Sequence, residues 1–169
     1  MIIGSTKLTI KNQDKLNRFF EEAPKDFKRG YSRAFDISGR EQEKYIKNRM
    51  LHDRKTGRLY KKYVGVNGRP LSTPKLHRAS APGEYPAVVT KKLYKSVGYE
   101  VRGFDILAIG MGTENMEYAK YLEFGTSKME ARSPIQQTAE EFGSKVREEI
   151  SKQMNRVLKL NDMGPSWMV

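Results

Sequence analysis

The chain has 169 residues and a formal net charge of +12, because 32 lysines and arginines stand against 20 aspartates and glutamates. Hydrophobic residues make up 37% of it, less than in most soluble domains, so we expect a thin core and either surface hidden against other copies or an excursion from a smaller body. It has no cysteine and only two histidines, which excludes disulfides, thiolate metal sites, a cysteine nucleophile and a His-rich metal site.

The N-terminal part predicts a short strand and then a long helical stretch. Residues 7–10 alternate polar and apolar side chains, and residues 13–52 place apolar side chains at helical spacing. Pro24 predicts a bend in this stretch, and Gly39 weakens its middle.

Residues 53–95 carry most of the excess positive charge. They contain 11 lysines and arginines against two acidic residues, a difference of +9, and four of the seven prolines. We expect residues 56–80 to form a poorly packed, mobile basic hairpin that projects from the body. Its candidate contacts to a partner or to DNA are Arg58, Lys61, Lys62, Arg69, Lys75, His77 and Arg78.

The hairpin is predicted from strand and turn patterns. Residues 58–66 read as a strand, and Asn67-Gly68 is a strong signal for a two-residue turn. The returning arm contains Pro70 and Pro74, so it can only be an edge strand or an irregular one.

The next segment predicts a second antiparallel hairpin. Residues 93–101 and 106–111 are apolar runs around a glycine-containing connection, and residues 90–97 are expected to enter the sheet. Residues 106–109 are apolar without alternation, which favours a central strand.

Two helices complete the predicted elements. Residues 115–124 predict a short helix that Gly125 ends in the left-handed conformation. Ser133-Pro134-Ile135-Gln136 is a capping box, and it predicts a last helix that runs to about Lys159. The side chains expected to bury this helix against the sheet are Phe142, Val146 and Ile150.

These elements predict the α+β class. A small antiparallel sheet of three to five strands should pack against the long N-terminal and C-terminal helices, with the basic β-hairpin projecting. We expect a single domain over residues 1–160 and a flexible tail over residues 161–169. No apolar run reaches the roughly 18 residues of a membrane span, and the polar N-terminus does not resemble a signal peptide, so no membrane contact is expected.

Catalysis is not expected, and neither is a cofactor or a bound metal. Gly110-Met111-Gly112 has no further glycine at dinucleotide-binding spacing. Tyr85, Asp105 and Glu123 do not form an acid–base pair that the sequence reveals. A small phosphodiesterase is the weakest of the functional classes considered.

The charge of residues 53–95 leaves two interpretations open. A basic segment with Tyr60, Tyr63, Tyr85 and Tyr94 interleaved is suited to contacts with DNA phosphates. The same composition also suits a solubilising hairpin without a ligand. No signature of sequence-specific recognition is present, so any nucleic-acid binding is expected to be non-specific.

Two sequence motifs, which we call the motif strings, are more specific than composition alone would explain. Residues 78–87 read Arg-Ala-Ser-Ala-Pro-Gly-Glu-Tyr-Pro-Ala, and residues 118–129 read Tyr-Ala-Lys-Tyr-Leu-Glu-Phe-Gly-Thr-Ser-Lys-Met, with Arg132 shortly after. Together they resemble the head–tail joining, or tail-completion, minor tail proteins of long-tailed bacteriophages over about residues 13–159. The residues that carry this resemblance are Ser80, Pro82, Gly83, Tyr118, Ala119, Glu123, Phe124, Gly125, Thr126 and Arg132.

The resemblance implies a structural protein of the virion and not an enzyme. Members of the family are thought to form a ring at the head-proximal end of the tail, where genome DNA passes. It implies a homo-oligomer that meets the head connector and tail-tube or tail-terminator proteins, with possible non-specific DNA contact. The implied location is the tail or neck of the virion, and the host cytoplasm during assembly. The alternative is a non-specific, basic nucleic-acid-binding accessory protein.

Overall fold

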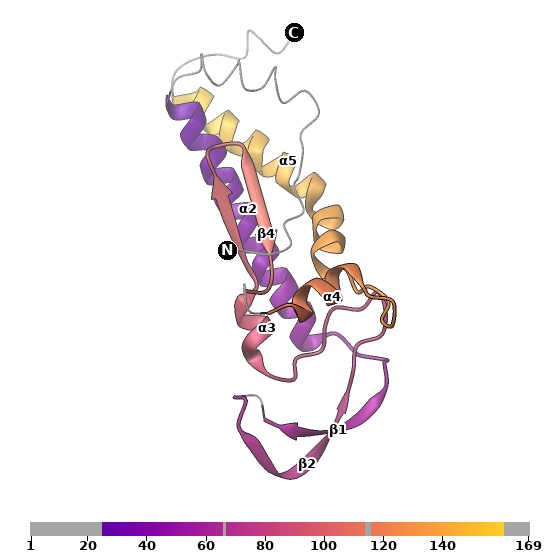
Figure 1. Ribbon diagram of the computed structural model, residues 1–169. Coiled ribbons are helices and arrows are strands. Elements are labelled where there is room, and N and C mark those ends of the chain that lie inside the picture. The colour runs from indigo at the N-terminus through magenta and orange to yellow at the C-terminus, as the bar shows by residue number, and fades with distance from the viewer. Residues whose placement is uncertain (1–24, 66, 114–115, 161–169) are drawn as a thin grey trace.

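The computed structural model describes residues 25–65, 67–113 and 116–160. In chain order its elements are α2 (Lys25–His52), β1 (Leu59–Val64), β2 (Pro70–Arg78), α3 (Lys91–Ser96), β3 (Gly98–Arg102), β4 (Ile106–Gly110), α4 (Tyr118–Phe124) and α5 (Pro134–Leu160). The α+β prediction is confirmed: α2 and α5 run antiparallel as an elongated body, and the β1–β2 hairpin projects from one end (Figure 1).

Some predictions fall outside the described residues. They are the strand at 7–10, the helical stretch at 13–24 with its bend at Pro24, and the tail at 161–169. The described part of the predicted 13–52 stretch is α2, which continues without a break from Lys25 to His52. The predicted weakness at Gly39 therefore does not interrupt the helix.

Gly39 stays in α2 because β3 lies close against the helix at this point. A Cβ on Gly39 would come within 2.3 Å of a Tyr99 ring carbon, so only glycine leaves room for the ring. The Tyr99 hydroxyl donates a hydrogen bond of 2.6 Å to the Asp36 carboxylate on α2, which holds the ring over the glycine. The residue that weakens the helix therefore allows the sheet to approach it.

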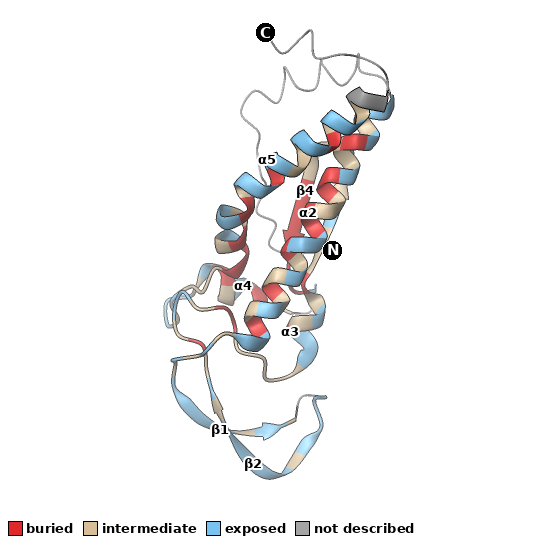
Figure 2. Ribbon diagram, turned by 180° about the vertical axis from the view of Figure 1, so that it is seen from behind, coloured by how far each residue is buried: buried red, intermediate tan, exposed pale blue. Residues whose placement is uncertain are grey.

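The core lies where α2, α5 and the β3–β4 sheet meet. Phe35 of α2, Leu107 of β4, and Phe142 and Val146 of α5 form one buried cluster. A second cluster, which includes Ile46 of α2, continues toward α3 and α4. Figure 2 shows the buried residues along the facing sides of α2, α5 and β4, whereas the β1–β2 hairpin has none.

The predicted sheet is corrected in two respects. Residues 91–96 form helix α3, and its Leu93 enters the core, so this segment does not begin a strand. Within the described residues, β3 pairs only with β4, so the sheet has two strands and β4 is not central. Burial explains the apolar run of β4. Leu107 belongs to the cluster that contains Phe142, and Ile109 belongs to the cluster that contains Ile46.

The predicted core face of α5 is confirmed at Phe142 and Val146, each 4% exposed. Ile150 is only partly buried, because it lies at the margin of the Phe35–Val146 cluster. The full penalty for deleting a buried side chain is therefore not expected at Ile150.

We predict that Gly39→Ala lowers the free energy of unfolding by about 1–3 kcal/mol, because the added methyl group overlaps a ring that its hydroxyl holds in place. Gly143→Ala on α5 is the matched control. A Cβ there has nothing within 4 Å, so this variant should gain about 0.5–1 kcal/mol from helix propensity. Urea unfolding followed by circular dichroism measures both, and equal stabilisation by the two substitutions would contradict the close packing of β3.

Candidate functional site

The projecting hairpin is an antiparallel pair with an irregular tip. Leu59 pairs with Arg78 and Lys62 with Lys75, and the register shifts between Lys62 and Val64. Neither strand packs extensively against a helix or against the β3–β4 sheet. The predicted basic hairpin is thus present, and the irregularity expected of a proline-containing arm is seen.

The turn is longer than the predicted two residues. Gly68 donates a backbone hydrogen bond of 2.9 Å to the Gly65 carbonyl, and Gly65 donates one of 2.8 Å to Arg69. Gly68 has a φ of 78°. In a two-residue turn at Asn67-Gly68 the residues on either side of this pair would bond to each other, but here Gly65 bonds to Arg69, so a longer turn beginning at Gly65 replaces it.

No acidic side chain among the described residues forms an ion pair with the cations of the hairpin. Residues 57–83 contain six lysines and arginines and no acidic residue. None of them takes part in an ion pair in the part of the chain that the structure describes. All are exposed except Lys62, which is partly buried; they are Arg58, Lys61, Lys62, Arg69, Lys75 and Arg78.

Two of these cations face each other. Lys62 and Lys75 are cross-strand partners, and like charges in this position destabilise a strand pair. His77 lies on the same face, partly buried, with its ring 5.4 Å from that of Tyr60 in an edge-to-face contact. Burial, and then the charge of Lys62, lower the pKa of His77. His77 is therefore a strand residue, and its lowered pKa favours the neutral imidazole.

A shallow groove of about 420 Å³ separates this face of the hairpin from the body. Tyr60 and His77 line one side, and Val88, Tyr118 and Leu122 are among the residues on the other. The lining is largely apolar, so the base of the hairpin is spaced from α4 without a packed core between them.

Polar contacts fix the base of the hairpin, and we call Thr56, Ser80, Glu84 and Arg132 the hairpin joint. The Glu84 carboxylate accepts hydrogen bonds from the Thr56 hydroxyl at 2.6 Å, from the Thr56 amide at 3.1 Å and from the Ala81 amide at 2.8 Å. These bonds hold the pKa of Glu84 below its usual value. Arg132 donates to the Ser80 hydroxyl at 2.7 Å and to the Ser80 carbonyl at 2.8 Å.

A second carboxylate fixes the start of α5. Glu123 of α4 is 7% exposed and accepts hydrogen bonds from the backbone amides of Ile135, at 3.1 Å, and Gln136, at 3.0 Å. Free amides at a helix N-terminus attract a negative charge, so Glu123 caps α5 from another element. Burial raises the pKa of Glu123, and these two hydrogen bonds oppose that shift.

The predicted capping box is therefore wrong. The Ser133 hydroxyl donates to the Glu123 carbonyl at 2.8 Å, and Ser133 has a φ of 42°, so it does not serve as the side-chain cap. The Gln136 side chain bonds forward to Glu140 instead of back to Ser133. The helix still begins at Pro134, as the proline predicts.

Gly125 has the positive φ that its place after α4 predicts. Its φ of 75° with a ψ of −176° is outside the left-handed helical region and in one essentially restricted to glycine. A Cβ would lie 2.8 Å from the Met129 carbonyl oxygen. Next to it, Thr126 exchanges backbone hydrogen bonds with Met129, which closes the loop that leads to Arg132.

The structure brings the two sequence strings together at one junction. Besides the Arg132–Ser80 contact, the Gly83 amide bonds to the Ala131 carbonyl at 3.3 Å, and the Gln137 side chain bonds to the Gly83 carbonyl at 3.0 Å. Ala119 is buried against Gly112. Among the motif residues only some reach the surface, namely Pro82, Gly83, Tyr118, Phe124 and Thr126.

One expected contact residue is corrected, and two functional roles were missed. Tyr85 is 1% exposed and bonds to the Thr138 hydroxyl at 2.9 Å, so it cannot belong to a phosphate-contacting face, and burial raises its pKa to about 12. The anchoring role of Glu84 and the capping role of Glu123 were not predicted. Glu84 is one of only two acids in residues 53–95, and that isolation was the signal available.

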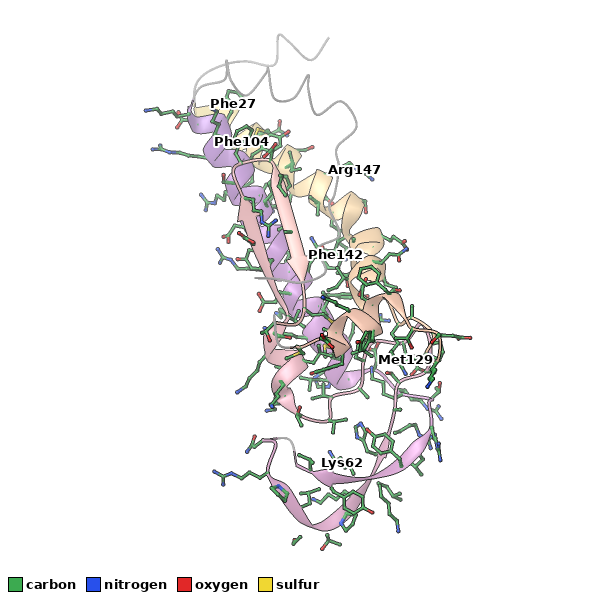
Figure 3. All side chains as sticks on the ribbon, viewed as in Figure 1. Phe27, Lys62, Phe104, Met129, Phe142 and Arg147 are labelled. Carbon is green, nitrogen blue, oxygen red and sulfur yellow. The ribbon has the colours of Figure 1, made fainter. Side chains whose placement is uncertain are left out.

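The part of the chain that the structure describes holds no group of three His, Asp or Glu side chains placed to bind a metal ion. None of its helices is long and apolar enough to cross a membrane. Figure 3 shows where the side chains lie: Lys62 is on the projecting hairpin, far from the body residues Phe142 and Arg147.

No protein-family model, no curated protein sequence and no solved structure matches this chain.

We predict that the wild type and Glu123→Gln differ in stability in a pH-dependent way. A carboxyl group whose pKa is raised in the folded state contributes most stability below its unfolded value of about 4.5, and this contribution is lost as the pH rises through the raised pKa. Urea unfolding between pH 4 and pH 8 should thus show that the free energy of unfolding of the wild type falls relative to that of the variant as the pH rises. If the wild type instead becomes more stable relative to the variant as the pH rises, the hydrogen bonds from the α5 amides affect the pKa of Glu123 more than burial does.

Proposed function

We propose that this protein is a structural component of a phage virion. In this proposal it completes the tail and joins it to the head connector within a ring-shaped oligomer, and the basic hairpin makes the contact. The observation that carries the proposal is the unneutralised charge of a projecting element: six cations, no acid and no ion pair among the described residues. The two motif strings supply the assembly context by resemblance.

Energetics favour a partner for the hairpin. An isolated two-stranded hairpin is marginally stable in water, and this one also carries the opposed Lys62 and Lys75. Leu76 is 67% exposed and Tyr63 63% exposed, so the hairpin buries little apolar surface of its own. Such an element gains stability from contacts that form only on assembly, while the joint keeps its base in place.

The second candidate is non-specific nucleic-acid binding. Exposed Tyr60 and Tyr63 next to Lys61 and Arg58 combine a base-stacking surface with phosphate contacts, which suits a DNA backbone. The two proposals are compatible in a ring through which DNA passes, but they predict different losses on mutation.

We predict that changing Arg58, Lys61, Lys62 and Arg69 together to Gln abolishes the joining of heads to tails. The fold should stay intact, because these side chains make no ion pair with any residue that the structure describes. Complementation of a deletion phage, scored by titre and by electron microscopy of unjoined heads and tails, measures this. The control changes four exposed cations of α2 and α5 to Gln: Arg33, Lys44, Arg147 and Arg156. Full titre from the hairpin variant would contradict the assembly role.

The DNA candidate has its own readout. If the hairpin binds DNA, the logarithm of the binding constant of the wild type should fall steeply with the logarithm of salt concentration. That slope should drop by about 0.9 for each phosphate contact that the hairpin variant loses. Equal slopes for the hairpin and control variants would leave charge alone, and not the hairpin, as the source of DNA affinity.

A further inference from the structure

The backbone of the hairpin has a defined inner and outer side. The Ala79 amide donates a hydrogen bond of 2.9 Å to the Arg58 carbonyl, and the same register pairs Tyr60 with His77 and Lys62 with Lys75. Hydrogen-bonded pairs alternate with non-bonded pairs in an antiparallel ladder. The amides and carbonyls of Tyr60 and Lys62 therefore face β2, whereas those of the intervening residues, Leu59 and Lys61, face outward.

The outward groups on β1 form an open sheet edge. Outside the β1–β2 ladder, no hydrogen bond among the described residues joins the amide or carbonyl of Leu59 or Lys61 to another group, and both residues are exposed. The opposite edge, on β2, is interrupted by Pro70 and Pro74, which have no amide hydrogen. Proline protects an edge against further strands, so the structure protects β2 and leaves β1 open.

Charge decides which strand can occupy this edge. A second copy of the hairpin would bring its own six cations against those of the first, which is repulsive. Lys61 and Lys62 are adjacent in sequence, so their side chains lie on opposite faces of the hairpin. A complementary strand therefore needs two adjacent acidic residues, one for each face. It also needs apolar neighbours to cover the exposed Leu59 and Tyr63.

We propose that the outer edge of β1 binds an extended acidic segment of a partner protein, which adds to the hairpin as a third strand. This rests on the proposed function, in which the hairpin engages a partner, and it specifies the partner as protein at this edge. The incoming strand pairs with the amides and carbonyls of Leu59 and Lys61, and its acidic pair meets Lys61 and Lys62. Such pairing supplies the third strand that a two-stranded hairpin lacks.

The test uses a synthetic octapeptide in which two adjacent glutamates are flanked by valines and threonines. Its control has the same sequence with N-methylated amides at alternate positions, which retains charge but prevents strand pairing. Amide hydrogen exchange by NMR should slow about tenfold or more at Leu59 and Lys61 with the first peptide and not with the second. Equal effects of the two peptides, or no slowing at saturation, would overturn the proposal.

A matched pair of variants separates the backbone from the charge. Lys61→Pro removes one outward amide hydrogen and no hydrogen bond within the hairpin, whereas Lys61→Ser removes the same charge and keeps the amide. The octapeptide should bind the proline variant about tenfold more weakly than the serine variant. Retained exchange protection at Tyr60 would show that the hairpin is still formed.

Equal peptide affinities for these variants would refute edge pairing even if the four-residue variant still fails to join heads to tails, in which case the hairpin acts through its side chains. We expect the Lys61→Pro and Lys61→Ser variants to bind duplex DNA with equal affinity, because phosphate contacts need no free strand edge. If Lys61→Pro loses the Tyr60 protection, the N-methylated peptide alone decides the outcome.

Discussion

The carboxylate of Glu84 is the interaction on which the position of the hairpin depends. It accepts hydrogen bonds from the amide and hydroxyl of Thr56, on the chain that enters β1, and from the amide of Ala81, on the chain that leaves β2. Hydrogen bonds to a charged acceptor are stronger than those between neutral groups. Because neither strand packs extensively on the body, these bonds and the Arg132–Ser80 contact do what a hydrophobic core does elsewhere.

The hairpin joint is continuous with the start of α5. Glu123 links α4 to the first amides of α5, and Arg132, between them, reaches back to the loop that follows β2. One compact set of polar contacts thus sets the direction of a long helix and of a projecting hairpin together. Several residues of the two motif strings, among them Ser80, Gly83, Glu123 and Arg132, make the contacts of this junction.

The sequence predicted the elements that depend on local pattern. The long helices follow from apolar periodicity, the basic hairpin from its charge and turn residues, and the positive φ of Gly125 from its place after a short helix. What failed depended on contacts between distant residues. Residues 91–96 form a helix whose Leu93 fills the core, and Ser133 loses its capping role to Glu123, ten residues earlier. Gly39 looked like a helix breaker because nothing in the local sequence reveals the ring of Tyr99 above it.

The hairpin is held at its base and is otherwise independent of the body. Native-state hydrogen exchange of the isolated wild type and of its Glu84→Gln variant tests this most directly. The hydrogen bonds from Thr56 and Ala81 use both carboxylate oxygens of Glu84, and a glutamine side chain has only one acceptor oxygen. We expect the inward amides of Tyr60, Lys62 and His77 to exchange about tenfold faster in the variant, and the amides in the middle of α2 and α5 to exchange at unchanged rates. Unchanged exchange in the hairpin, or faster exchange throughout the protein, would contradict it.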